Sequence, residues 1–218
     1  MHVQYSFGNK SRLADEKLGR NDGGYNNRYE KGFTEIIAAQ APHSTYGDVF
    51  CKLIPFWQLE LYYSHVKGYK DFYADVHEQV RQRPNPSNDS EAILAFIKIC
   101  CDVAKEDLTD FFKIWGLLTS KDLMRDAQKY PKPAMNLHYI HDDCVEDFRN
   151  DRSLSKGTIE IDSKKVKLAD WKNVAVFEVY DDKKLVFITP KTEFDIPSSV
   201  NKPVIYAVPV KGIREKAF

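Results

Sequence analysis

The chain has 218 residues, of which 43% are hydrophobic and 13% aromatic, a composition that excludes a disordered protein and can supply a sizeable core. Lys and Arg together number 32, as do Asp and Glu, and the net charge of zero gives no sign of a nucleic-acid partner. The sequence holds no apolar run of about 18 residues that would predict a transmembrane segment, and its N-terminus, MHVQYSFGNKSRL, lacks the apolar core of a signal peptide.

The N-terminal part of the chain predicts an irregular segment followed by a helix. Asn, Asp and Gly residues that favour turns are frequent in residues 1–27, so we expect this segment to be irregular. Apolar residues then fall on one face of a helix over residues 28–40.

Four further apolar stripes at helical spacing predict the next helices, and they begin at Phe50, Phe72, Ile93 and Leu108. Either Asp89 or Ser90 is expected to cap the third of these helices, because its side chain can accept from the free N–H groups of the first turn. Residues 120–130 predict a weaker, polar helix. Together these elements predict a helical bundle domain over residues 1–130.

Beyond residue 130 the apolar period becomes two. The sequence Tyr130-Pro131-Lys132-Pro133 predicts a linker, so that residues 131–218 form a small β-rich module. Leu137–Tyr139 is expected to add a strand to it, and residues 142–149 a short helix. Five alternating segments predict the strands of a small antiparallel sandwich or sheet: Ile159/Ile161, Val166/Leu168, Val174/Val176, Leu185/Phe187 and Val204/Tyr206/Val208. The predicted fold class is therefore α+β.

An ordered set of short motifs resembles one family. Residues 53–81 carry Pro55-Phe56-Trp57-Gln58-Leu59, Leu61-Tyr62, Gly68, Asp71-Phe72-Tyr73 and Arg81. A later helix pair carries Cys101-Asp102-Val103, Asp107-Leu108-Thr109-Asp110-Phe111-Phe112 and Trp115-Gly116. This set resembles the C-terminal half of the enhancin-like zinc metallopeptidases, which include mucin- and glycoprotein-cleaving enzymes of gut bacteria. Residues 3–28 resemble the segment after the family's third metal ligand, and residues 171–179 with 204–208 resemble its C-terminal β-module.

The resemblance implies a part of an enzyme without its metal site. In this family an HExxH helix and a downstream Glu hold zinc, and neither HExxH nor HxxEH occurs in the 218 residues. Catalytic and metal-binding residues are therefore expected in an upstream catalytic domain of the same parent chain, which would be the partner of this one. Zinc would be the parent's cofactor, glycoproteins such as mucins its substrates, and its location secreted or on the cell surface.

For the chain itself, the resemblance implies the helical wall of the substrate cleft and a trailing β-module, inactive alone. Tyr25, Arg28, Tyr29 and His43 lie on or beside loops that follow the family's metal-binding segment, and they are the candidates for substrate contact. Trp57, Tyr62, Tyr63 and Trp115 could stack on sugars, but their helical spacing favours the core.

Two clusters hold residue types that bind metals. His77-Glu78 begins HEQVR, in which Arg81 replaces the second His of HExxH and stays protonated. The segment His138-Tyr139-Ile140-His141-Asp142-Asp143-Cys144 is richer, but in a strand its two histidines would point to opposite faces. We expect structural roles for both clusters and no metal.

Two other functions stay open from the sequence. The chain could be a glycan- or glycoprotein-binding module built of a helical domain and a β-sandwich. It could also be a stand-alone cytoplasmic interaction protein without catalysis, in which the resemblance reflects ancestry alone.

Overall fold

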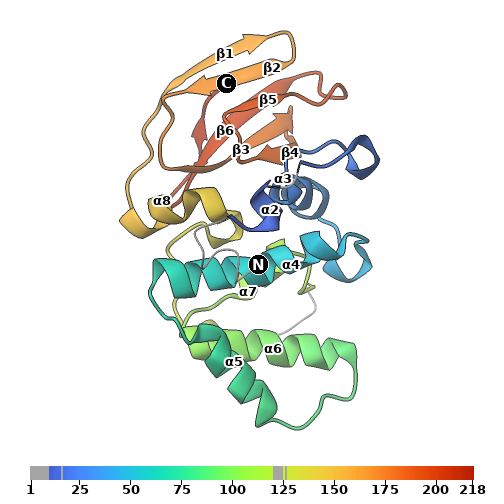
Figure 1. Cartoon of the computed structure of the whole chain (residues 1–218), viewed down its shortest axis with the longest axis vertical. Coiled ribbons are helices and arrows are strands. Elements are labelled where there is room, and N and C mark those ends of the chain that lie inside the picture. The colour runs from blue at the N-terminus through green and yellow to red at the C-terminus, as the bar shows by residue number, and fades with distance from the viewer. Residues whose placement is uncertain (1–9, 16, 120–124, 126) are drawn as a thin grey trace.

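A computed structural model of the chain describes residues 10–15, 17–119, 125 and 127–218. Its fold class is α+β, as predicted. The helical elements are α2 (Arg12–Asp15), η1 (Arg20–Asp22), α3 (Arg28–Gly32), η2 (Phe33–Ala38), η3 (His43–Thr45), α4 (Val49–Glu60), η4 (Leu61–Val66), α5 (Phe72–Arg81), α6 (Asp89–Ala104), α7 (Thr109–Ile114), η5 (Ala127–Lys129), η6 (Leu137–Tyr139), η7 (Asp142–Cys144) and α8 (Val145–Asn150). In Figure 1 the strands lie at one end of the molecule, α5 and α6 at the other, and α4 and α7 between them.

The strands form two antiparallel sheets. The first has the order β1-β2-β5 and the second the order β4-β3-β6-β7. Their bounds are β1 (Thr158–Asp162), β2 (Lys165–Ala169), β3 (Val174–Asp181), β4 (Lys184–Thr189), β5 (Glu193–Asp195), β6 (Pro203–Pro209) and β7 (Glu215–Lys216). All five predicted strands occur. The sequence did not predict β5 and β7, because segments of three and two residues show no measurable alternation.

The four predicted apolar stripes lie in α4, α5, α6 and α7, and residues 28–38 are helical as expected. Two of these helices change their winding before they end. The α-helix α3 continues into the π-helical η2, and α4 continues into the π-helical η4. The aromatic residues expected in the core are buried: Trp57, Tyr62, Tyr63 and Trp115.

Three local predictions are wrong. Leu137–Tyr139 is the 3-10 helix η6 and not a strand, because the N–H of Tyr139 bonds locally to Asn136 O at 2.9 Å and so is not free for a ladder. The cap of α6 is Asn88, one residue before Asp89, and its side chain accepts the N–H of Glu91 at 3.0 Å. Within the segment expected to be irregular, Arg12–Asp15 forms α2, since Leu13 packs fully into the core.

The weaker helix expected over residues 120–130 falls mostly outside the described residues, within which Ala127–Lys129 forms the 3-10 turn η5. In the described part of the chain, every helix falls short of the length and apolar character that a membrane crossing requires.

One hydrophobic cluster takes residues from both sides of position 131. It joins Phe33 and Trp115 of the helical part to Phe148 of α8 and Val176 of β3. Thr34 of η2 also bonds the edge of β4, since its hydroxyl accepts the N–H of Ile188 at 3.1 Å. A second cluster combines side chains of both sheets, with Val166, Phe194, Phe177 and Ile205 among them. The domain division at 130/131 stays a prediction.

Candidate functional site

A polar cluster surrounds the N-terminal end of α4. Asp48 caps this helix by accepting the N–H of Phe50 at 2.9 Å. Its other carboxylate oxygen lies 2.7 Å from Arg28 Nη1 and 3.1 Å from Lys31 Nζ, and all three side chains are largely buried. Burial raises the pKa of the Asp48 carboxyl, but the hydrogen bond from Lys31 and the charge of Arg28 lower that pKa overall. The candidate Arg28 therefore serves to fix the start of α4.

Glu35 of η2, whose charge is felt by Lys31, holds two tyrosines beside this cluster. Tyr46 donates its hydroxyl to Glu35, and Tyr25 also hydrogen-bonds this carboxylate. Burial, followed by the charge of Glu35, raises the pKa of Tyr25, so its hydroxyl stays protonated. Tyr25 is half-buried and packs on the core of the β-sheets. Because the proton of this hydroxyl goes to Glu35, the oxygen can accept a hydrogen bond from a substrate N–H or sugar hydroxyl.

The other two candidates are buried and bonded within the chain. Tyr29 is on α3, but its side chain points away from the cluster around Asp48. Its hydroxyl donates to Asp142 Oδ2 at 2.6 Å. His43 begins η3, with Nε2 3.0 Å from the carbonyl of Lys52 on α4, and burial lowers its pKa. The structure thus places Arg28 in the Asp48 cluster and Tyr25 beside Glu35, and it leaves Tyr29 and His43 outside both groups.

Sequence reasoning missed the partners of these candidates. Asp48 could have been found, because an Asp directly before an apolar helical stripe is a cap signal. Glu35 and Tyr46 carry no such signal, since their meeting with Tyr25 depends on how three separate segments pack.

In the segment from His138 to Cys144, the side chains of His141 and Cys144 bond within the chain. His141 Nε2 lies 2.9 Å from Ala175 O, and His141 Nδ1 accepts the N–H of Asp143 at 3.3 Å. The Cys144 thiol contacts the backbone of His141. Across the described residues, no group of three or more His, Cys, Asp and Glu side chains could hold a metal ion.

His77, which begins HEQVR, is exposed on α5 and lies at the edge of an apolar hollow of about 390 Å3. Phe56, Ile93 and Phe96 are among the residues that line this hollow. The imidazole stands edge-on to the ring of Tyr73, with the centroids 6.0 Å apart, in a solvent-exposed position.

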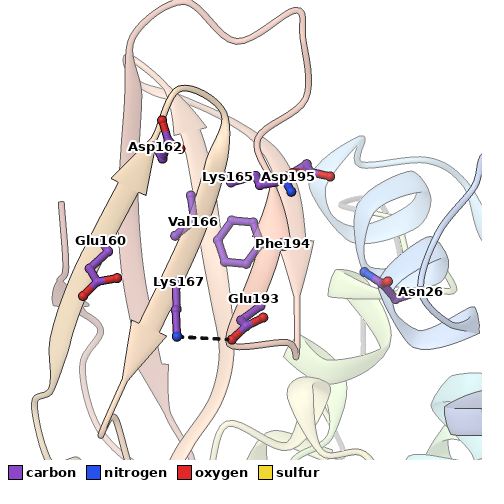
Figure 2. A pocket seen from close by; sticks show the side chains of 9 residues that line it. All are labelled: Asn26, Glu160, Asp162, Lys165, Val166, Lys167, Glu193, Phe194 and Asp195. Carbon is purple, nitrogen blue, oxygen red and sulfur yellow. Dashed lines mark ion pairs between the residues drawn. The ribbon is translucent and has the colours of Figure 1, made fainter.

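A charged groove of about 440 Å3 lies over the polar face of β1, β2 and β5. Figure 2 shows its side chains, with Asn26 of the N-terminal loop across from them. The strand register places the charges in two rows, each with a lysine between two carboxylates: Glu160–Lys167–Glu193 and Asp162–Lys165–Asp195. Lys167 Nζ lies 4.0 Å from Glu193 Oε1. Because opposite charges alternate across the strands, the lysines and carboxylates of this face stabilise one another.

A sequence model of one family matches the chain. The model describes peptidase M60, enhancin and enhancin-like proteins, and it matches residues 2–116, a little over half of the chain. A search of curated proteins finds no match.

Solved metallopeptidase structures share the fold. A metallopeptidase from Bacteroides thetaiotaomicron matches with a TM-score of 0.64 and 21% identity, over 90% of this chain and 43% of that one. A metallopeptidase in complex with Tn antigen matches with a TM-score of 0.66 and 22% identity, over 98% of this chain and 48% of that one. The catalytic module of the metalloprotease ZmpA from Clostridium perfringens matches with a TM-score of 0.64 and 20% identity, over 99% of this chain and 42% of that one. The chain thus spans less than half the length of each of these structures.

Proposed function

The chain belongs to the peptidase M60 family of enhancin and enhancin-like proteins, and from this we propose that it is the portion of a zinc metalloendopeptidase that follows the metal-binding segment. Its parent acts on glycoproteins such as mucins. The chain supplies the helical wall of the substrate cleft and a β-rich module, and it does not cleave protein alone.

The family match carries this proposal, together with the absence of HExxH from the 218 residues. The described residues also lack a ligand set that fits zinc. We therefore assign the metal, and the peptide-bond chemistry that it supports, to an upstream catalytic domain that is the partner of this chain. The roles left for these residues are to bind and orient the substrate.

Among the four candidates for substrate contact, Tyr25 has the strongest support. Its ring is half-buried, and its hydroxyl is held by Glu35 beside a second tyrosine. Arg28, Tyr29 and His43 are buried, with at most 9% of the residue exposed. They are proposed to hold α3, η3 and α4 in the wall of the cleft by their bonds to Asp142, Lys52 and Asp48.

A glycosylated substrate is supported by the fold match to a metallopeptidase in complex with Tn antigen. A secreted or surface location of the parent follows from such a substrate, because mucins lie outside the cell. The alternative function is a glycan-binding module without catalysis, and the experiments below distinguish it from a part of an enzyme.

The first test is the DNA upstream of the Met1 codon. An in-frame segment that encodes HExxH and a downstream Glu is expected. A chain extended to include it should cleave a mucin in an EDTA-sensitive manner, whereas the 218-residue chain and an extended chain with Glu→Gln in HExxH should not. EDTA-sensitive cleavage by the 218-residue chain would overturn the assignment of the metal to an upstream domain. A stop codon directly upstream would overturn the proposal that the chain is part of a longer enzyme.

Tyr25→Phe and Tyr25→Ala in the extended chain test the cleft. Loss of the hydroxyl is expected to raise KM, and loss of the ring to raise it further, with kcat little changed. Equal KM values for both variants and the unmodified chain would remove Tyr25 from the cleft.

A further inference from the structure

The carboxylate of Asp142 gathers four donors from three other segments. Its Oδ1 accepts the N–H of Ser11 at 2.6 Å, and its Oδ2 accepts the Ser11 hydroxyl at 2.9 Å. The hydroxyl of Tyr29 and the indole N–H of Trp57 reach Oδ2 at 2.6 and 3.3 Å. Asp143 next to it pairs with Lys10. Residues 10–15 are thereby tied to α3 and α4 through η7.

The ring of His141 fixes the orientation of η7. It is only 4% exposed, and its two nitrogens have opposite roles. Nε2 donates to Ala175 O on β3 at 2.9 Å, which leaves Nδ1 as the acceptor for the N–H of Asp143 at 3.3 Å. This arrangement needs the neutral imidazole, because a protonated Nδ1 would place one donor against another.

We propose that residues 141–144 form a pH-sensitive latch, which holds residues 10–15 against α3 and α4 when His141 is neutral and loosens them when His141 is protonated. His141 acts directly on the residues that hold the N-terminal segment. Its imidazole caps the start of η7 by accepting the N–H of Asp143, and η7 carries both Asp142 and Asp143.

Within the described part of the chain, charged groups act on His141 from three segments. Asp142 and Asp143 on η7 and Asp147 on α8 favour the cation, whereas Lys191 between β4 and β5 opposes it. Uncharged groups beside His141 include the Cys144 thiol, the Ala175 carbonyl and the ring of Tyr29, whose centroid is 5.8 Å away. Burial outweighs the carboxylates and lowers the pKa of His141.

The direction of the switch follows from this balance. A histidine that is released from the latch titrates near its ordinary pKa of about 6.5. Because the closed latch holds a lowered pKa, it is fully stable above about pH 6.5 and loses stability as the pH falls towards that lowered value. His138 stays neutral in the same range, since burial lowers its pKa to about 4.

The test is amide hydrogen exchange of the 218-residue chain at pH 7.5 and 5.0. The N–H of Ser11 bonds Asp142 directly, so its protection factor reports on the latch. In the unmodified chain this factor should fall at least tenfold at the lower pH. His141→Asn keeps a capping acceptor and cannot titrate, so the fall should be less than about twofold.

Two control variants show whether the change in Ser11 protection depends on His141 and on Asp142. His77→Asn, on the exposed face of α5, should behave as the unmodified chain does. Asp142→Asn should lower the protection of Ser11 at both pH values. An unchanged protection factor in the unmodified chain would overturn the latch, as would an equal fall in His141→Asn.

If His141→Asn does not fold, the ring of His141 can be titrated by NMR in the unmodified chain. Its midpoint must then coincide with the loss of Ser11 protection. A separation of the two midpoints by more than one pH unit would also overturn the proposal.

Discussion

Replacing Gln58 by Met should destabilise the chain more than its modest change of side chain suggests. Gln58 is on α4 and is fully buried. Its amide nitrogen donates to the carbonyls of His138 at 2.9 Å and Ile140 at 2.8 Å, and its amide oxygen accepts the indole N–H of Trp115 at 2.8 Å. One side chain thus satisfies polar groups from η6, the residue after it and the end of α7.

The size of the expected loss of stability follows from the polar groups that lose their hydrogen-bond partner. Methionine fills a similar volume but cannot make these bonds, so two buried carbonyls and one indole N–H lose their partner. An unsatisfied buried group costs about 1–3 kcal/mol. Removing the buried amide recovers part of that cost, and we expect the free energy of unfolding to fall by about 3–5 kcal/mol. That is a large share of the roughly 5–15 kcal/mol typical of a domain.

Urea denaturation followed by far-UV circular dichroism measures this change. Gln82→Met is the matched control, because Gln82 is exposed at the end of α5 and should change stability by less than about 0.5 kcal/mol. Trp115→Phe removes one of the three bonds, and a double-mutant cycle with Gln58→Met should give a coupling of about 1 kcal/mol. A loss below about 1 kcal/mol for Gln58→Met would refute the reasoning.

Three further predictions concern other parts of the fold. Gly116 has φ +68°, and a Cβ there would lie 2.3 Å from Ala41 O, so Gly116→Ala should lower the free energy of unfolding, measured by urea denaturation, by about 3 kcal/mol or more. Gly24→Ala is the control, because Gly24 has φ +70° in open space and its substitution should cost only the backbone strain of about 1 kcal/mol. Equal losses of stability in the two variants would contradict the clash. Burial lowers the pKa of His138 to about 4, so stability should be full above about pH 6.5 and fall by at most about 3 kcal/mol towards pH 4, a fall that His138→Gln should reduce. Because one core cluster crosses position 131, calorimetry should show a single transition, whereas two transitions would support the predicted division.

The sequence was sufficient for the elements that depend on local periodicity. The stripes that begin at Phe50 and Ile93 predict α4 and α6, and the alternation of Val166 and Leu168 predicts β2. These patterns hold because one face of each element meets the core. Leu137–Tyr139 shows the limit, since three residues with apolar ends fit a strand or a 3-10 turn equally well.

The candidate site was less predictable, because its bonds join distant segments. Tyr25 and Glu35 are ten positions apart in sequence, and their contact depends on the path of the loop before α3. Asp142 meets Ser11 across 131 positions, which no local pattern encodes. The metal-binding residue types around His141 have a structural role, since they cap η7 and bond it to neighbouring segments.

The signature Pro55-Phe56-Trp57-Gln58-Leu59 gains a physical meaning from these contacts. Trp57 donates to Asp142, and Gln58 joins η6 to Trp115 of the second motif. The two motifs that carry the family resemblance are therefore bonded to each other and to the segment that follows them. A sequence can keep this signature because it holds the fold together, whether or not a metal site is present. Membership in the M60 family established through residues 2–116 thus identifies the fold, and catalysis has to be established from the zinc ligands themselves.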